Sequence, residues 1–140
     1  MATITEDYYS FETTEDYCSF ETAKLLKEKG FNEYCWCWYE EDGYFRESND
    51  HFGIQSNSDH VVEDDEFTCS APTLQRAMKW LREVHNLHID VDPSEGDWNP
   101  NILELEDWSY VVKPGDEIPI QDSYEEACEA AIKYCLENLI

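Results

Sequence analysis

Positive charge is scarce in this chain. Nine residues are Lys or Arg, against 33 Asp or Glu, so the formal net charge is −24 over 140 residues. Direct binding to nucleic acid relies on Lys and Arg to neutralise phosphates, and a chain with this balance repels a duplex. The same repulsion applies to nucleotides and to anionic membrane surfaces. The composition therefore argues against direct nucleic-acid binding and favours basic partners, whose approach an acidic surface accelerates at low salt.

Long apolar runs and glycine are also scarce. No stretch approaches the roughly 18 apolar residues of a membrane span, and residues 1–7 lack the basic and apolar regions of a secretory signal. We therefore expect no membrane association and a cytoplasmic location, where cysteine thiols stay reduced. The chain has five glycines, and none of them builds a Gly-rich phosphate-binding loop.

Aromatic residues, in contrast, are abundant. They make up 14% of the chain, with five Trp and nine Tyr, whereas disordered acidic chains are poor in aromatics. The charge therefore decorates a folded body, which we expect to be one domain at 18–140. Residues 6–14 (EDYYSFETT) and 15–23 (EDYCSFETA) form a tandem repeat. Only the second copy runs into a helical pattern, so residues 1–17 are predicted to be a flexible N-terminal arm.

Three segments carry helical patterns. The first spans residues 19–29, the second begins near Pro72, and the third begins at Ser123, which stands three residues before a glutamate as in a capping box. An unbroken apolar stripe follows in the third segment. On the outer face of that helix, Glu129 and Lys133 are four residues apart and predict an ion pair.

Strand formers concentrate in the segments between the predicted helices. Residues 34–39 (YCWCWY) predict a strand, 40–43 a turn and 44–46 the returning strand of a hairpin. Further strands are expected at 87–91 and 108–112. The order α-β-β-α-β-β-α predicts an α+β fold, with three helices packed on one face of a small, mainly antiparallel sheet.

Three blocks of the chain together resemble one group of proteins. Residues 19–31 (SFETAKLLKEKGF), 71–84 (APTLQRAMKWLREV) and 123–131 (SYEEACEAA) resemble small uncharacterised proteins of gut-bacterial mobile elements and their phages. The resemblance covers about a quarter of the chain and implies a phage or mobile-element setting. It implies no activity, since none is known for the group. The N-terminal repeat and the acidic loop at 47–66 depart from the group's pattern.

The negative charge is concentrated between residues 40 and 66, which hold ten carboxylates and one Arg. Carboxylates spaced along a folded surface can stand in for phosphates, because a partner's Lys and Arg respond to field and spacing. We therefore predict a non-enzymatic interaction protein that engages a basic host protein as a nucleic-acid mimic. The alternative is an acidic surface that only keeps the chain soluble. The predicted contact residues are Glu40, Glu41, Asp42, Glu63, Asp64, Asp65 and Glu66.

Trp98 is the candidate interface anchor. It stands in the loop-like sequence at 96–100 (GDWNP), and an exposed tryptophan inside an acidic rim is typical of a binding hot spot. The alternative interpretation is that the ring folds back over the core.

Two pairs of closely spaced residues, Cys35 with Cys37 and His85 with His88, could contribute ligands to a metal ion. Cys35-x-Cys37 could supply two thiolates to zinc, with Cys69, His85 or His88 as further ligands, but structural zinc sites usually have gaps of two to four residues. Packing of the cysteines in the core, and a favourable position of the histidines at a helix end, are the simpler interpretations.

A third spacing, in residues 90–101, resembles a calcium loop only weakly. We predict no metal and no cofactor. The alternative function is a small-molecule or metal-binding protein that sequesters its ligand. An enzyme has the least support, because no carboxylate pair or Cys–His signature stands out.

Overall fold

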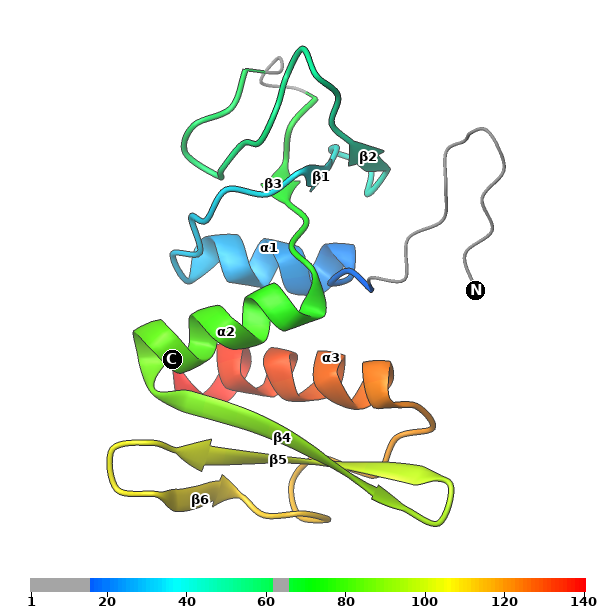
Figure 1. Cartoon of the computed structure of the whole chain (residues 1–140), viewed down its shortest axis with the longest axis vertical. Helices are drawn as coiled ribbons and strands as arrows, with labels where there is room; N and C mark the ends of the chain where they lie inside the picture. The colour runs from blue at the N-terminus through cyan, green and yellow to red at the C-terminus, as the bar shows by residue number, and fades with distance from the viewer. Residues whose placement is uncertain (1–15, 62–65) are drawn as a thin grey trace.

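Two three-stranded antiparallel sheets and three helices make up the computed structural model, which describes residues 16–61 and 66–140 (Figure 1). The predicted α+β class is confirmed, but the strands form two separate sheets instead of one. In chain order the elements are α1 (Phe20–Glu28), β1 (Cys37–Tyr39), β2 (Phe45–Glu47), β3 (Cys69–Ser70), α2 (Leu74–His85), β4 (Leu87–Ser94), β5 (Asp97–Glu104), β6 (Ser109–Val112) and α3 (Tyr124–Tyr134), which continues as a π-helix over Cys135–Leu139.

Each helix begins at a hydroxyl cap. The side-chain oxygens of Ser19, Thr73 and Ser123 accept hydrogen bonds from backbone N–H groups in the first turns of α1, α2 and α3. Such a bond satisfies one of the N–H groups that a helix start leaves without a partner. The predicted starts of α1 and α3 are therefore confirmed, while α2 begins two residues after Pro72.

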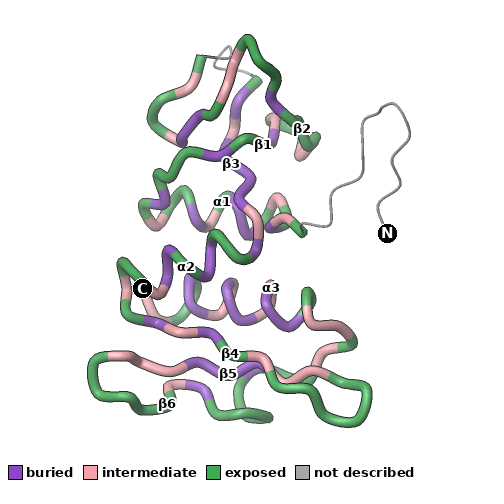
Figure 2. Tube along the Cα trace, in the orientation of Figure 1, coloured by how far each residue is buried: buried purple, intermediate pink, exposed green. Residues whose placement is uncertain are grey.

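The main core lies between the helices and the second sheet. Figure 1 shows α2 and α3 on one face of the β4–β6 sheet, with α1 and the small β1–β3 sheet stacked beyond them. Buried residues lie along α2, α3 and the middle of the β4–β6 sheet (Figure 2). Leu81 of α2, Ile102 of β5, and Ile132 and Leu136 at the C-terminal end of the chain are fully buried in one cluster.

The first sheet has β1 at its centre, in the order β2-β1-β3. Successive side chains of β1 point to opposite faces. Cys37 and Tyr39 pack in one cluster, and Trp38 packs with Phe67 in another. Both faces of β1 are therefore apolar, which suits its central place in the sheet. The strand predicted at 34–39 is thus confirmed only for its last three residues.

The sequence prediction missed β5, which is the central strand of the second sheet. The break expected after residue 91 is only a two-residue turn, in which Glu95 and Gly96 have φ values of 51° and 93°. Asn and Pro are depleted in strands, so residues 97–104 look like a loop in the sequence. Pairing with β4 along the full length of β5 overrides that preference.

Trp108 was expected to begin the last strand, but β6 begins one residue later. Trp108 has a φ of 60°, a left-handed backbone conformation that costs a non-glycine residue about 1–2 kcal/mol. The side chain is 75% exposed. A bulky residue at this turn position is therefore opposed by both backbone sterics and solvent.

Truncating the core tests the packing. Ile132→Ala removes a fully buried side chain and is expected to lower the free energy of unfolding by about 2–5 kcal/mol, measured by urea denaturation. Val84→Ala is the matched control, because Val84 is also helical but 56% exposed. Equal losses in the two variants would contradict the described core.

Candidate functional site

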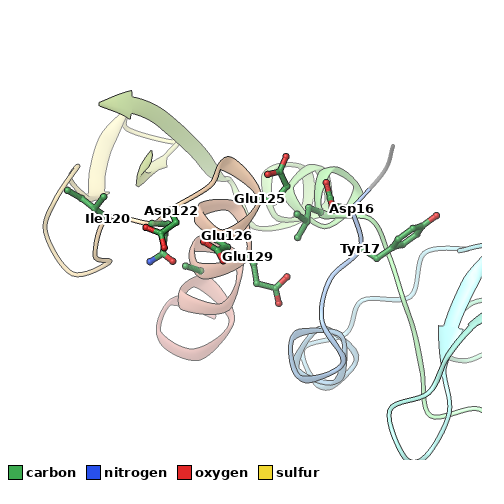
Figure 3. A pocket seen from close by; sticks show the side chains of 10 residues that line it. Asp16, Tyr17, Ile120, Asp122, Glu125, Glu126 and Glu129 are labelled. Atoms are coloured by element: carbon green, nitrogen blue, oxygen red, sulfur yellow. The ribbon is translucent and has the colours of Figure 1, made fainter. Parts of the chain in front are cut away.

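A large acidic hollow among the described residues opens between the N-terminal segment, the start of α2 and the first turns of α3 (Figure 3). Its volume is about 600 Å³. Neither Lys nor Arg is among the described residues that line it. Its five carboxylates belong to Asp16, Asp122, Glu125, Glu126 and Glu129.

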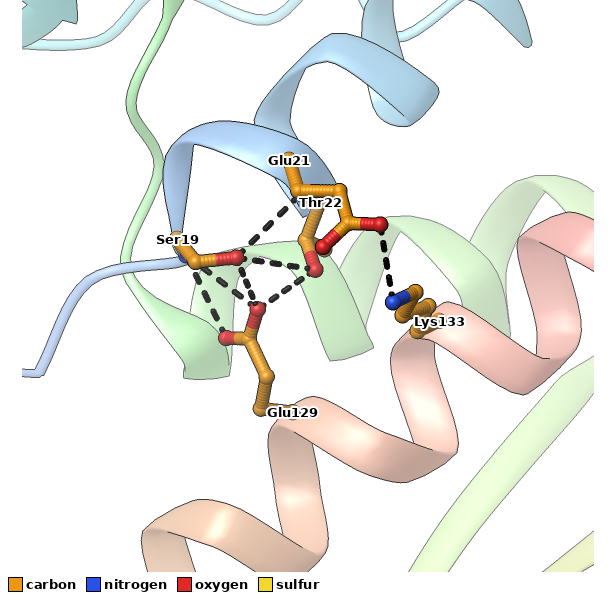
Figure 4. A network of polar contacts seen from close by, with 5 residues as sticks. All are labelled: Ser19, Glu21, Thr22, Glu129 and Lys133. Carbon is orange, nitrogen blue, oxygen red and sulfur yellow. Dashed lines mark hydrogen bonds and ion pairs between the residues drawn. The ribbon is translucent and has the colours of Figure 1, made fainter. Parts of the chain in front are cut away.

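Glu129 has a structural task in this hollow. Its carboxylate accepts hydrogen bonds from the Ser19 hydroxyl at 2.5 Å, from the Ser19 backbone N–H at 3.2 Å and from the Thr22 hydroxyl (Figure 4). An ionised acceptor makes such bonds stronger, and the positive end of α1 adds to the attraction. Glu129 therefore fastens the first turn of α1 to α3.

The predicted ion pair between Glu129 and Lys133 is wrong. The Lys133 ammonium lies 2.9 Å from a carboxylate oxygen of Glu21 on α1, and this hydrogen bond raises the pKa of Lys133. Because α1 packs against α3, it supplies both residues with partners that the spacing within one helix cannot reveal (Figure 4).

Asp16, Asp122, Glu125 and Glu126 form no ion pair with any described residue. Asp122, Glu125 and Glu126 lie at the start of α3, where negative charge stabilises a helix. Asp16 belongs to the segment before α1. The backbone carbonyl of Asp16 accepts a hydrogen bond from the Leu74 N–H at 2.9 Å. Asp16 and Tyr17, assigned to the flexible arm in the sequence analysis, are thus held against the start of α2. Residues 1–15 of that arm lie outside the described residues.

The smaller acidic hollow has a volume of about 250 Å³ and lies at the β1–β2 turn. Its lining residues are Glu40, Glu41, Asp42 and Glu66, so the structure gathers four of the seven predicted contact residues around one depression. The other three, Glu63, Asp64 and Asp65, lie outside the described residues.

The β1–β2 turn is held firmly. The Gly43 N–H donates to the Glu40 carbonyl at 2.8 Å, and the Asp42 carboxylate accepts from the Tyr44 N–H at 3.0 Å. Gly43 has a φ of 89°, and a Cβ atom there would meet the Phe20 ring at 3.0 Å, so the position requires glycine. Arg46 forms an ion pair with Glu40 at 3.5 Å. The turn therefore presents consecutive carboxylates in a fixed arrangement.

Trp98 lies in β5, not in a loop, and the loop assignment is wrong. It pairs with Pro93 of β4, and its backbone bridges to Gln121. The indole packs edge-on against Tyr124 with 5.9 Å between ring centroids. The ring is thus half-buried beside α3, and its role as an interface anchor stays a prediction.

All six cysteines are buried free thiols. Cys35 belongs to the main core, while Cys37 and Cys69 lie in the cluster beside β1. Burial raises the pKa of each of these three thiols to about 11, so they stay protonated at neutral pH. Because the thiolate is the nucleophile, thiols that stay protonated and buried are poor nucleophiles.

The histidines do not join the cysteines. His85 ends α2 with its ring edge-on to Trp80 at 4.8 Å, and His88 lies on β4. Within residues 16–61 and 66–140, no group of three or more His, Cys, Asp or Glu side chains is arranged to hold a metal ion.

The basic residues of α2 do not form an anion-binding wall. Arg76 and Lys79 line a depression of about 70 Å³ together with Glu33 and Glu83. Arg76 pairs with Glu33 at 3.4 Å. Carboxylates thus accompany the positive charges here, which counts against a nucleotide ligand.

No helix in the described ranges is long and apolar enough to cross a membrane. Comparisons with protein-family models, with curated proteins and with solved structures find no match for this chain. The candidate sites are therefore defined by their geometry and charge alone.

Replacing Glu129 tests the link between α1 and α3. Glu129→Gln removes the charge that three donors share, and we expect a loss of about 1–3 kcal/mol in the free energy of unfolding. Glu106→Gln removes the same charge from an exposed side chain between β5 and β6, away from any helix end, and should change stability by less than about 0.5 kcal/mol. Urea denaturation compares the two, and equal effects would contradict the anchoring role of Glu129.

The buried thiols predict a loss of stability at alkaline pH. Burial raises the pKa of Cys35, Cys69 and Cys128 from 9.0 to about 11 and that of Cys135 to about 12. Above pH 9 the unfolded chain releases these protons and the folded chain keeps them. Their stabilisation is therefore complete below pH 9 and declines as pH rises toward 11, by up to about 1.4 kcal/mol per pH unit for each thiol.

Urea denaturation between pH 8.5 and 10.5, with a reducing agent present, measures this decline. Cys135→Ala removes one of the titrating groups, so its stability should start lower and fall less steeply with pH. A parent and variant with the same slope would show that the thiols do not cause the decline.

Proposed function

We propose that this chain is a non-enzymatic, acidic interaction protein of phage or mobile-element type. It acts in the cytoplasm and binds the basic surface of a host protein as a nucleic-acid mimic. One observation carries the proposal: all five carboxylates of the larger hollow and three of the smaller one have no ion-pair partner among the described residues.

The energetics favour a basic partner. A small soluble domain needs a net charge of about 2–8 in magnitude, and this chain carries −24. Within the described residues three ion pairs join Arg46 to Glu40, Arg76 to Glu33 and Lys133 to Glu21. The remaining carboxylates repel one another, and a partner rich in Lys and Arg relieves that repulsion.

The form of the hollows supports mimicry of nucleic acid. Both are open depressions. Acidic residues make up half of the lining of the larger one and the whole lining of the smaller one. Both are built on fixed elements, the start of α3 and the β1–β2 turn. A protein groove that binds a phosphate backbone presents Lys and Arg, which carboxylates held on a rigid surface attract in the same way. The protonated state of the buried thiols favours a binding role over cysteine-based catalysis.

A second candidate function is sequestration of a small cation. The larger hollow, at about 600 Å³, falls in the range of about 300–1,000 Å³ that is typical of ligand pockets. Its five carboxylates suit a linear polyamine. Isothermal titration with spermidine tests this alternative: binding of one molecule, lost on neutralising the hollow, would favour it over a protein partner.

Three variants of equal charge change test the protein-binding proposal. Each replaces three carboxylates by their amides. The first set is Asp122→Asn, Glu125→Gln and Glu126→Gln; the second is Glu41→Gln, Asp42→Asn and Glu66→Gln; the control set, on other surfaces, is Glu28→Gln, Glu83→Gln and Glu137→Gln.

The parent chain is first used at low salt to capture a basic protein from a bacterial lysate. We expect duplex DNA to compete for the captured protein. In a direct binding assay, either hollow variant should weaken the complex at least tenfold and flatten its salt dependence, while the control set stays within about threefold. Salt-insensitive binding, or equal losses in all three variants, would refute the proposal.

A further inference from the structure

The turn between β5 and β6 presents a tryptophan that the fold does not use. Trp108 is 75% exposed and has a φ of 60°, a backbone conformation suited to Gly or Asn. Its side chain has no ring contact or hydrogen bond among the described residues. Strain and exposure together at a bulky residue are typical of a functional position.

The turn that carries Trp108 is rigid. The Glu104 carboxylate accepts hydrogen bonds from the N–H groups of Glu106 at 2.9 Å and Asp107 at 3.2 Å. The Asp107 carboxylate accepts from the Ser109 N–H and, at 2.7 Å, from its hydroxyl. These bonds lower the pKa of Asp107. A turn whose backbone is held this firmly loses little conformational freedom when it binds a partner.

The strand after the turn lies at the edge of its sheet. The order is β4-β5-β6, so within the described chain one side of β6 has no neighbouring strand. Tyr110, in the middle of β6, is 50% exposed. An uncovered edge with exposed aromatic side chains can accept an extended segment as an additional strand.

The negative charge around Trp108 favours a basic partner segment at the β6 edge. Glu104, Glu106 and Asp107 stand beside Trp108, and an indole face attracts a Lys or Arg side chain. A second copy of this chain would bring another net charge of −24 to the same edge, which opposes self-pairing. We propose that Trp108 anchors a docking site at the β6 edge for an extended, basic segment of a partner protein. The inference rests on the basic partner of the proposed function but assigns a surface separate from the two acidic hollows.

The experiment uses a defined probe. This is an acetylated, amidated octapeptide of alternating Arg and Val, which can form a strand. A second peptide of equal charge replaces each Val by Pro and cannot pair along an edge. Titration of the full chain, followed by backbone amide NMR shifts, should show binding of the Val peptide with the largest changes in residues 104–112.

Two tryptophan variants complete the test. Trp108→Gly should weaken binding of the Val peptide at least tenfold while melting close to the parent, since Gly suits the φ of 60°. Trp36→Ala is the control, because Trp36 is also exposed, at 38%, but precedes β1; it should stay within about twofold.

Equal affinity for the Pro peptide, no effect of Trp108→Gly, or self-association through β6 would each overturn the inference. Amide shifts confined to the two acidic hollows would overturn it as well, while supporting the proposed function. Conversely, the amide variants of the hollows leave the β5–β6 turn unchanged. If those variants bind the captured protein as the parent does, the proposed function fails, but the peptide titration at the β6 edge is unaffected.

Discussion

The attachment of α1 to α3 through Glu129 is the contact on which the arrangement of the two sheets depends. α1 lies between the small sheet and the helical layer (Figure 1). On one side Lys27 donates to the Thr68 carbonyl at 2.6 Å, just before β3. On the other, Ser19 and Thr22 donate to Glu129. The nine-residue helix α1, held by this carboxylate, therefore joins the small sheet to the main core, together with the direct chain connection from β3 to α2.

Negative charge has two uses in this chain. Glu129 and Glu21 join α1 to α3, and the carboxylates at the start of α3 favour the helix itself. Asp42, Glu104 and Asp107 accept hydrogen bonds that hold turns. Glu41, Glu66 and Glu106, in contrast, make no side-chain hydrogen bond or ion pair with any described residue. Since the core is built from apolar side chains and six protonated thiols, the fold does not depend on this surplus. It remains available for recognition.

The sequence predicted what local chemistry determines. Hydroxyl caps at Ser19 and Ser123 predicted the starts of two helices. The strand formers at 34–39 predicted a strand, of which only Cys37–Tyr39 forms, while Trp36 stays exposed. β5 was missed because Asn99, Pro100 and Asn101 are poor strand formers whose pairing with β4 is decided by tertiary structure. A two-residue turn with positive φ at Glu95 and Gly96 was the available signal for that hairpin.

The acidic hollows likewise combine residues that are neighbours in sequence with residues that only the fold brings together. Glu40, Glu41 and Asp42 are neighbours in sequence and were predicted together, but the approach of Glu66 depends on the fold. Asp16 and Asp122 are far apart in the chain, and only the packing of the N-terminal segment beside α3 brings them to one hollow. Trp108 was missed as an anchor because a left-handed backbone conformation is not encoded by a strand-like sequence.

The buried thiols have one more consequence. Oxidation of cysteine follows thiolate character and exposure, and in this chain all six sulfurs are buried and unpaired. Peroxide and disulfide reagents therefore find no accessible thiol to attack while the chain is folded. The protein should keep its structure in air without added reductant and tolerate oxidative stress that inactivates proteins with reactive surface cysteines.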